Sequence, residues 1–406
     1  MTSLIQPAPN YQNVACVAPF SSMFVNSNGD SFPCCKFNYR ARTRIDESKD
    51  QNWNFNNINQ KIREEFLSKG SDISSYDNCF MCSLNPKGGQ YLRHNLSANE
   101  DIDYITNPTL TNLHLKFSNQ CNLACRICES GCSSLLNSED KLLMQANIRK
   151  EGLPRLNLRL DPNSVLMASI KENIHNLNTL YISGGEPLLQ EEVWEFLQLA
   201  FDQGYSKNIA LEFNTNGTVK LSKERYDILK SFKKIDIMVS MDGIGKHAEY
   251  IRTNSSWERW VENVKNYQQE FINYPNLRLT IILTVSVYNV HIVDKILSFF
   301  TDELNIHVDL NFVYEPYELC VFNINQSLKD ELVNYYRQQL AEIKNENNKT
   351  RVYNELINFI NNKNNISHNE IIPFIDGKDN IVIANNLYKN YKAYKDVDIE
   401  WYNKLK

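Results

Sequence analysis

Three cysteines within eight residues are the part of this sequence whose types and spacing most clearly carry chemistry. They are Cys121, Cys125 and Cys128, and they follow an apolar alternation at residues 113–117 that is typical of a β-strand. A structural zinc site takes four ligands, usually as two Cys-x-x-Cys pairs, and this stretch offers no fourth cysteine at that spacing. An iron–sulfur cluster with three thiolate ligands and one open iron fits better. Structural zinc and simply buried thiols stay as alternatives.

The pattern Cys-x3-Cys-x2-Cys after a first strand resembles the signature of the radical S-adenosylmethionine (radical SAM) superfamily. In that family the amino and carboxylate groups of the cofactor's methionine chelate the open iron of a [4Fe-4S] cluster. The resemblance implies that Cys121, Cys125 and Cys128 hold such a cluster and that the chain binds S-adenosylmethionine. Ile127 stands where the family often has an aromatic residue, a departure that keeps the position apolar.

A glycine-rich turn at residues 183–187 follows the next predicted strand. Paired glycines let the backbone approach a ligand closely, and a neighbouring carboxylate can accept hydrogen bonds from an ammonium group. Alone, Gly-Gly-Glu-Pro is more often an ordinary turn. It also resembles the radical SAM motif that binds the amino group of the cofactor's methionine. That resemblance implies cofactor contacts at Gly184, Gly185, Glu186 and Pro187.

Polar residues after three further predicted strands resemble other cofactor-contacting positions of the family. They are short amides, a hydroxyl followed by a carboxylate, and an arginine suited to a bidentate pair with the methionine carboxylate. The resemblance implies cofactor binding by Asn214, Asn216, Ser240, Asp242, Arg252 and Asn289. The alternatives are a plain Asn-Gly turn, a solvated arginine and, at Asn289, a helix cap.

Strand-like and helix-like segments alternate between residues 106 and 320, which indicates repeated βα units and a parallel sheet. The predicted strands are residues 112–117, 179–183, 209–214, 235–240, 277–287 and 307–313. Together they predict an α/β fold, a partial, open (β/α)6 barrel of the TIM type. Ligands of such sheets bind at the carboxyl ends of the strands, where the motifs described above lie.

A second group of cysteines lies in residues 1–105, which are predicted to form a small domain with a hairpin and a helix. Asn28-Gly29 predicts a type I′ turn between strands at residues 20–27 and 30–35. Residues 53–67 have helical spacing. Folding this helix back onto the hairpin would bring four thiols together, namely Cys16, Cys34 or Cys35, Cys79 and Cys82.

This cysteine set resembles a twitch domain, the shortened SPASM unit that carries an auxiliary cluster beside radical SAM cores. In better-known members the unit follows the core, whereas here it precedes it. The resemblance implies a second iron–sulfur cluster of the [4Fe-4S] type. The predicted ligands are Cys16, Cys34, Cys79 and Cys82, with Cys34 preferred over Cys35 for its distance from Gly29. Zinc on the same thiols stays as the alternative, because a zinc ribbon offers the same residues.

The C-terminal part, residues 321–406, is predicted to be helical and to pack across the open side of the barrel. Residues 328–344 and 356–360 have helical spacing on either side of an Asn/Lys-rich loop. Cys132 and Cys320 have no partner by spacing and are predicted to be small buried apolar side chains, with hydrogen-atom relay by a thiol at the barrel mouth as the alternative. The seven histidines are scattered, and none is predicted to bind a metal.

Composition narrows the functional classes. The 406-residue chain has a net charge of −5 with both signs scattered, which argues against binding to the phosphate backbone of DNA or RNA. No signal-peptide pattern is visible, and no apolar run approaches the roughly 20 residues of a membrane span. Ten cysteines without a secretion signal predict metal or redox chemistry in the reducing cytoplasm.

These features predict a radical SAM enzyme. As the family implies, an electron from a reductant protein such as flavodoxin or ferredoxin allows cleavage of S-adenosylmethionine to methionine and a 5′-deoxyadenosyl radical, which takes a hydrogen atom from a substrate. A peptide is the preferred substrate, and a sugar or small metabolite is the alternative. A non-catalytic regulatory protein that binds zinc or an iron–sulfur cluster is the competing class. Formation of 5′-deoxyadenosine distinguishes the two classes.

Overall fold

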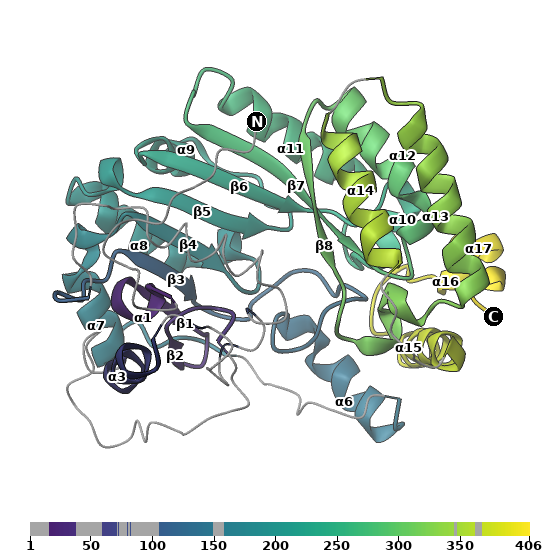
Figure 1. The fold of residues 1–406 in the computed structure, drawn as a ribbon, viewed down its shortest axis with the longest axis horizontal. Coiled ribbons are helices and arrows are strands. Elements are labelled where there is room, and N and C mark those ends of the chain that lie inside the picture. Colours follow the sequence, from purple (N-terminus) through teal and green to yellow (C-terminus); the bar gives the residue numbers. More distant parts are fainter. Residues whose placement is uncertain are drawn as a thin grey trace.

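The computed structural model describes residues 16–37, 59–70, 72, 79, 82, 105–148, 158–344, 347–361 and 368–406. Within these residues the strands form one eight-stranded sheet in the order β2-β1-β3-β4-β5-β6-β7-β8. Every neighbouring pair is parallel except β1 with β2. The described strands thus curve into an open sheet and confirm the predicted α/β partial barrel (Figure 1).

The barrel strands follow the predicted segments to within two residues. They are β3 (Asn112–Lys116), β4 (Thr179–Ser183), β5 (Ala210–Thr215), β6 (Lys234–Ser240), β7 (Leu277–Val285) and β8 (His307–Phe312). Side chains alternate across each strand, so that Leu211 and Phe213 of β5 are buried while Glu212 and Asn214 between them are half-buried. The buried side packs against helices, and the other side faces the barrel interior.

Helices connect successive strands, and most of them cover the outer side of the sheet, whereas α6 (Asn137–Gln145) lies away from it (Figure 1). The others are α7 (Val165–Glu172), α8 (Glu191–Asp202), α9 (Lys223–Lys230), α10 (Gly245–Ile251), α11 (Trp257–Glu270) and α12 (Val293–Ser298). Serines begin three of them: the hydroxyls of Ser164, Ser222 and Ser256 each accept a backbone N–H from the first turn. These caps set where each helix starts after its loop.

The predicted N-terminal hairpin is present as β1 (Ser22–Val25) and β2 (Ser31–Phe32), but its turn differs from the prediction. In the loop only Gly29 has a positive φ, and its N–H donates to the carbonyl of Asn26 at 2.9 Å. This is a three-residue loop with one left-handed glycine, which shifts the pairing by one residue from a type I′ turn. Because β1 also pairs with β3, the hairpin continues the barrel sheet across the predicted boundary near residue 105.

A helix, α3 (Gln60–Lys69), packs beside the hairpin. The predicted helix began at residue 53, and residues 53–58 lie outside the described part of the chain. Arg63 is buried, and its Nε donates to the carbonyl of Pro19 in α1 (Ala18–Ser21) at 2.7 Å. This bond fixes α3 against the segment that follows Cys16.

The C-terminal helices lie beyond the edge strand β8, and α14 (Asn348–Ile360) packs directly against it (Figure 1). The others are α13 (Gln326–Ala341), α15 (Ile371–Ala384), α16 (Tyr394–Val397) and α17 (Ile399–Lys404). Asn348 exchanges two hydrogen bonds with the backbone of Val308 in β8, at 2.8 and 2.9 Å, and Arg351 donates to the same carbonyl at 2.6 Å. Phe359 stacks on Phe312, with ring centroids 3.7 Å apart. The helical part therefore closes the free edge of the sheet.

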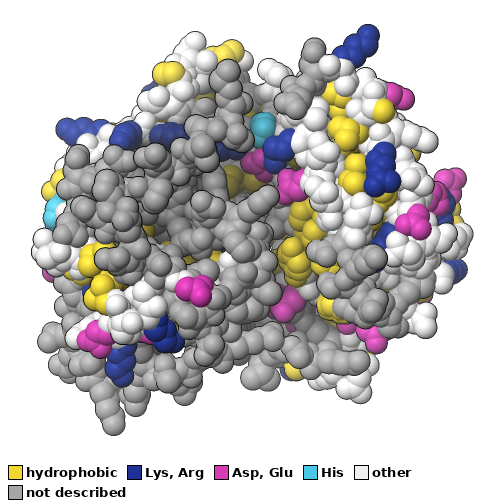
Figure 2. Space-filling model, viewed as in Figure 1, with side chains coloured by type: hydrophobic (Ala, Val, Ile, Leu, Met, Phe, Trp, Pro, Cys, Tyr) yellow, Lys and Arg dark blue, Asp and Glu magenta, His cyan; other side chains and the backbone are white. Residues whose placement is uncertain are grey.

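Charged side chains of both signs are interspersed over the helical right-hand part of the molecule (Figure 2). The right-hand part therefore carries no continuous basic stripe. Among the described helices, none combines the length and the apolar composition needed to cross a membrane.

Candidate cluster and cofactor site

The three predicted cluster cysteines meet around one cavity at the carboxyl ends of β3 to β6. The cavity has a volume of about 230 Å³. Its lining residues are Lys116, Cys121, Leu123, Cys125, Cys128, Cys132, Ser133, Ser183, Gly184, Gly185, Asn214, Thr215, Asn216, Ser240 and Arg252. The structure thus brings the cysteine motif, the glycine turn and several predicted cofactor residues to one place.

The spacing of the three thiols suits a cluster better than a single ion. Among the described residues, the sulfur atoms of Cys121, Cys125 and Cys128 do not all lie within 4.8 Å of one another. The group that meets this limit is His247, His291 and Asp398. Four thiolates around zinc lie about 3.8 Å apart, since each Zn–S bond is about 2.3 Å long. An iron–sulfur cube distributes its cysteine ligands over separate irons and needs a wider set. The donor set and its spread therefore fit a cluster with three protein ligands.

Two side chains donate toward the sulfur atoms of this trio. Asn216 Nδ2 lies 3.8 Å from Cys121 Sγ, and Arg252 Nη1 lies 4.0 Å from Cys125 Sγ. Burial raises the pKa of Cys125 to about 12, although the positive charge of Arg252 acts in the opposite direction. Without a bound metal this thiol stays protonated at neutral pH, so metal binding must release its proton.

The glycine turn is pressed against the backbone that leads into Cys121. Gly185 has a φ of +52°, and a Cβ atom there would lie 2.2 Å from the carbonyl oxygen of Gln120. The N–H of Glu186 donates to that same carbonyl at 2.8 Å. Because only glycine allows both this conformation and this approach, the turn after β4 fixes the position of the cysteine loop.

The Glu186 carboxylate does not face the cavity, contrary to the prediction that it binds a ligand ammonium group. It is fully buried and accepts hydrogen bonds from Thr215 Oγ1 at 2.7 Å, the N–H of Asn216 at 2.6 Å and the N–H of Leu188 at 3.1 Å. Burial raises the pKa of Glu186 to about 7, and these donors act to lower it. The side chain ties the turn after β4 to the turn after β5. Pro187 is likewise buried and does not line the cavity.

Both asparagines predicted to bind the cofactor at the carboxyl end of β5 line the cavity. Asn214 Oδ1 accepts a hydrogen bond from the hydroxyl of Tyr181 at 2.7 Å, and Asn216 Nδ2 also donates to Asn122 Oδ1 at 2.8 Å. The Asn216 carbonyl accepts a hydrogen bond from Trp260 Nε1 at 3.0 Å, which holds the turn against the helix layer. The segment is therefore both a packed turn and part of the cavity wall.

The predicted residues at the ends of β6 and β7 divide into two sets. Ser240 and Arg252 line the cavity, whereas Asp242 and Asn289 are buried behind it. Asp242 pairs with Arg252 Nη2 at 2.8 Å and accepts the N–H of Thr284 at 2.9 Å. Asn289 donates to the carbonyl of Asp242 at 2.9 Å. Asp242 and Asn289 thus orient Arg252 and the β6 end, and the predicted direct contact of these two with a cofactor does not agree with their positions.

The sequence region that builds this cavity matches a known family. Residues 115–300 match the model of the Radical SAM superfamily. These residues are a radical SAM domain. No curated protein matches the chain.

Solved structures of radical SAM proteins also match. Against anSMEcpe with bound AdoMet the identity is 20%, the match covers 58% of this chain and 62% of that one, and the TM-score is 0.40. SuiB of Streptococcus suis bound to S-adenosylmethionine is 16% identical, the match covers 70% of this chain and 58% of that one, and the TM-score is 0.34. The radical S-adenosylmethionine methyltransferase TsrM of Kitasatospora setae, with cobalamin and a [4Fe-4S] cluster bound, is 9% identical. That match covers 50% of this chain and 34% of TsrM, and the TM-score is 0.35. The match thus spans less than two thirds of the length of anSMEcpe.

Sequence reasoning missed several residues that line the cavity of the radical SAM domain. Lys116 at the end of β3 lines this cavity. Its aliphatic carbons pack against Gly184, where an added Cβ atom would lie only 3.0 Å from the Cβ and Cγ atoms of Lys116. The alternation of β3 already places Lys116 and His114 on the inner face, which is a signal for a polar interior position. Cys132 was predicted to be a buried apolar side chain, but it is only partly buried and lines the cavity, whereas Cys320 is buried as predicted. A hydrogen bond with Cys132, together with burial, raises the pKa of Cys128.

The second cysteine set lies outside the radical SAM domain and is only partly described. Burial raises the pKa of Cys34, and three nearby thiols raise it further. Those thiols are Cys16, Cys35 and Cys79. Cys35 instead lies near Lys116 and Cys82. The structure therefore groups Cys34 with two of its predicted co-ligands, and the identity of a bound metal there stays a prediction.

We expect Gly185→Ala to destabilise the radical SAM domain by about 2 kcal/mol or more, through the clash with the Gln120 carbonyl and the positive φ. Because the clash lies next to Cys121, iron content per chain should fall as well. Gly204→Ala is the matched control: it has a φ of +72° but open space around its Cβ position. Iron analysis and anaerobic urea denaturation measure both effects. Equal losses in the two variants would contradict the assigned role of the close approach.

Proposed function

We propose that this chain is a radical SAM enzyme that cleaves S-adenosylmethionine reductively and uses the product radical to take a hydrogen atom from a substrate. The observation that carries the proposal is the convergence of Cys121, Cys125 and Cys128 with the glycine turn and Arg252 around one cavity. A bound [4Fe-4S] cluster with S-adenosylmethionine supplies one-electron cleavage to methionine and a 5′-deoxyadenosyl radical, the electron coming from a reductant protein such as flavodoxin or ferredoxin.

The chain's own residues hold and orient the reactants. The amide of Asn216 and the guanidinium of Arg252 donate toward the Sγ atoms of Cys121 and Cys125. Hydrogen bonds of this kind to metal ligands tune the basicity of those ligands. Arg252 is fixed by Asp242 through Nη2, while its buried Nε has no hydrogen-bond partner in the described part of the chain. An arginine held in this way is suited to bind the carboxylate of the cofactor's methionine.

The other polar cavity residues complete the proposed cofactor site. Since the Glu186 carboxylate is engaged by protein donors, the methionine amino group is bound by the backbone at Gly184 and Gly185. Asn214 and Ser240 line the same cavity and offer hydrogen-bonding groups for the ribose hydroxyls. Holding the reacting atoms in a small cavity is the main contribution a protein makes to cofactor chemistry.

We expect Arg252→Lys to weaken binding of S-adenosylmethionine about 10- to 100-fold, because an ammonium group cannot replace a bidentate guanidinium contact. Anaerobic equilibrium binding to the iron-loaded protein measures the dissociation constant. Arg225→Lys is the control, since Arg225 pairs with Glu191 at 2.7 Å outside the cavity. Unchanged affinity in Arg252→Lys would show that this side chain does not bind the cofactor.

The proposed auxiliary site and substrate rest on the twitch-like resemblance. A second iron–sulfur cluster on Cys16, Cys34, Cys79 and Cys82 would raise the iron content from roughly four to roughly eight atoms per chain, whereas zinc there would leave it at roughly four. A peptide is the proposed substrate class, with a sugar or small metabolite as the alternative.

The decisive experiment is the formation of 5′-deoxyadenosine by anaerobically reconstituted protein given S-adenosylmethionine and dithionite. Quantification of 5′-deoxyadenosine and methionine by mass spectrometry should show both products in equal amounts. Full iron and sulfide loading with neither product, in the presence or absence of candidate peptides, would favour the competing class, a non-catalytic metal-binding protein.

A further inference from the structure

Two histidines and one aspartate that are far apart in the sequence meet in the structure, outside the cysteine cavity. His247 lies in α10, His291 in a short helical turn, η8 (Val290–Ile292), and Asp398 caps α17. Their possible ligand atoms all lie within 4.8 Å of one another. The separation of these residues along the chain explains why sequence spacing predicted no histidine as a metal ligand.

The two histidines contact the same carboxylate oxygen of Asp398. Asp398 Oδ2 lies 2.9 Å from His247 Nε2 and 2.8 Å from His291 Nε2. The other carboxylate oxygen accepts the N–H of Trp401 at 3.0 Å, and the Trp401 ring stacks on His291 with centroids 4.2 Å apart. The carboxylate and one imidazole are therefore already held in orientation, as a metal site requires.

Side-chain adjustments convert this arrangement into a metal site. Nitrogen and oxygen ligands lie about 2.0–2.2 Å from zinc, so two ligands of a tetrahedral ion are about 3.3 Å apart. Each histidine nitrogen would move away from the Asp398 oxygen by about 0.5 Å, and the two histidine nitrogens, which lie within 4.8 Å of each other, would settle near the same separation of about 3.3 Å through ordinary side-chain rotations. The side chains of His247, His291 and Asp398 are 16%, 14% and 16% exposed, so an ion can reach them.

The protonation state also suits metal binding. Burial lowers the pKa of His291, and the neighbouring His247 and Lys295 act in the same direction, while Asp398 opposes them. A neutral imidazole is the form that coordinates a metal. Hydrogen bonds from the two histidines lower the pKa of Asp398, which keeps the carboxylate ionised.

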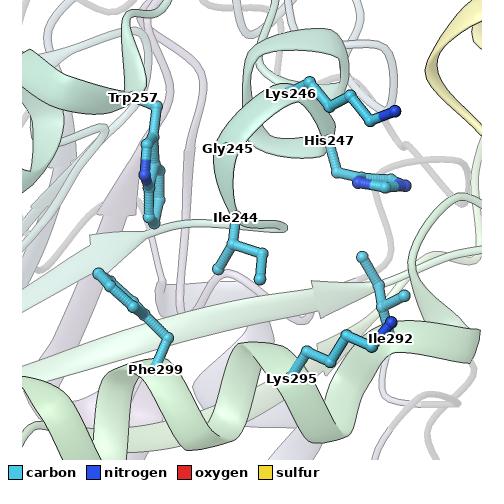
Figure 3. A pocket seen from close by; sticks show the side chains of 8 residues that line it. All are labelled: Ile244, Gly245, Lys246, His247, Trp257, Ile292, Lys295 and Phe299. Carbon is cyan, nitrogen blue, oxygen red and sulfur yellow. The ribbon is translucent and has the colours of Figure 1, made fainter.

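A pocket adjoins this cluster. It has a volume of about 440 Å³, and His247 forms part of its wall. In Figure 3 His247 projects from the start of α10 beside Lys246 and above Ile292, while Trp257 and Phe299 form the opposite side. Two protein nitrogens and one carboxylate leave a tetrahedral ion with one open position. The pocket borders the cluster at His247.

We propose that His247, His291 and Asp398 bind a divalent transition metal ion, zinc being the ion that this ligand set suits best, with a water molecule as the fourth ligand. The set of two histidines and one carboxylate is one that proteins use for zinc with an open position. The bound ion links α10, whose last turn leads to Arg252, with the C-terminal helix α17.

Zinc binding to the fully reconstituted protein tests this proposal without any measurement of activity. Iron loading occupies the cluster cysteines first, and zinc chloride is then added anaerobically. X-ray absorption at the zinc edge should show one zinc per chain with nitrogen and oxygen ligands near 2.0 Å, whereas a thiolate site gives sulfur ligands near about 2.3 Å. Absence of bound zinc, or sulfur ligation alone, overturns the proposal.

Variants then assign the ligands. We expect His247→Ala to bind zinc at least about tenfold more weakly, and His291→Gln to do the same. His175→Ala is the matched control, because that histidine is exposed, lies outside the cluster and contacts the backbone carbonyl of Glu172 at 2.9 Å. Equal zinc affinity in all three variants would reject the assignment. If a ligand variant fails to fold, the zinc-edge spectrum of the unaltered protein still decides between nitrogen and sulfur ligation.

Discussion

Cys125→Ala is expected to abolish formation of 5′-deoxyadenosine from S-adenosylmethionine. Cys125 lines the cavity together with Cys121 and Cys128, and loss of one thiolate leaves two protein ligands for a cluster that needs three. The reductive cleavage assay on anaerobically reconstituted protein measures the effect, and iron content measured on the same sample shows whether the cluster is lost.

Cys320→Ala is the control for this variant. Cys320 is 1% exposed and does not line the cavity, so its replacement removes a thiol without touching the proposed site. We expect this variant to keep its iron and its activity. If Cys125→Ala still formed 5′-deoxyadenosine at the rate of Cys320→Ala, the proposed function would have to be abandoned.

Glu139→Ala is expected to reduce the free energy of unfolding by about 3–5 kcal/mol, because it removes the carboxylate that compensates the buried charge of Arg126. Arg126 lies between two cluster cysteines, is fully buried, and pairs with Glu139 at 2.5 Å. Lys378 of α15 donates to the carbonyl of Arg126 at 3.0 Å and lies 3.6 Å from Glu139. Burial alone would raise the pKa of Glu139, but Arg126 and Lys378 lower it, so the carboxylate is ionised.

Glu270→Ala is the matched control, because Glu270 forms an exposed pair with Lys230 at 3.2 Å. Its loss should cost at most about 1 kcal/mol. Urea denaturation under anaerobic conditions measures both variants. Since Arg126 lies in the cysteine loop, Glu139→Ala should also lower iron content, whereas Glu270→Ala should not. Similar stability in the two variants would mean that the buried network does not hold the loop.

The sequence predicted the sheet well because strand formation depends on local alternation of apolar residues. All six predicted barrel strands are present, and the cysteine and glycine motifs lie at their carboxyl ends. The hairpin turn was predicted less well. Asn-Gly favours a type I′ turn, but β1 also pairs with β3, and the observed loop contains three residues with a single left-handed glycine.

Side-chain direction could not be predicted, because it depends on partners from other strands. Glu186 follows β4 as expected, yet its carboxylate turns to Thr215 at the end of β5. Asp242 turns in the same way to the backbone of Thr284. A motif therefore places a residue at the end of a strand, and the neighbouring strands decide whether its side chain reaches the cavity.

The contact of α14 with β8 limits how this protein can associate with other chains. A strand at the margin of a sheet normally offers its backbone to any extended peptide, and many complexes and aggregates form in this way. Here Asn348 and Arg351 already occupy the outward N–H and carbonyl of Val308. Strand addition along β8 would require α14 to detach first, so this margin is protected against intermolecular sheet growth.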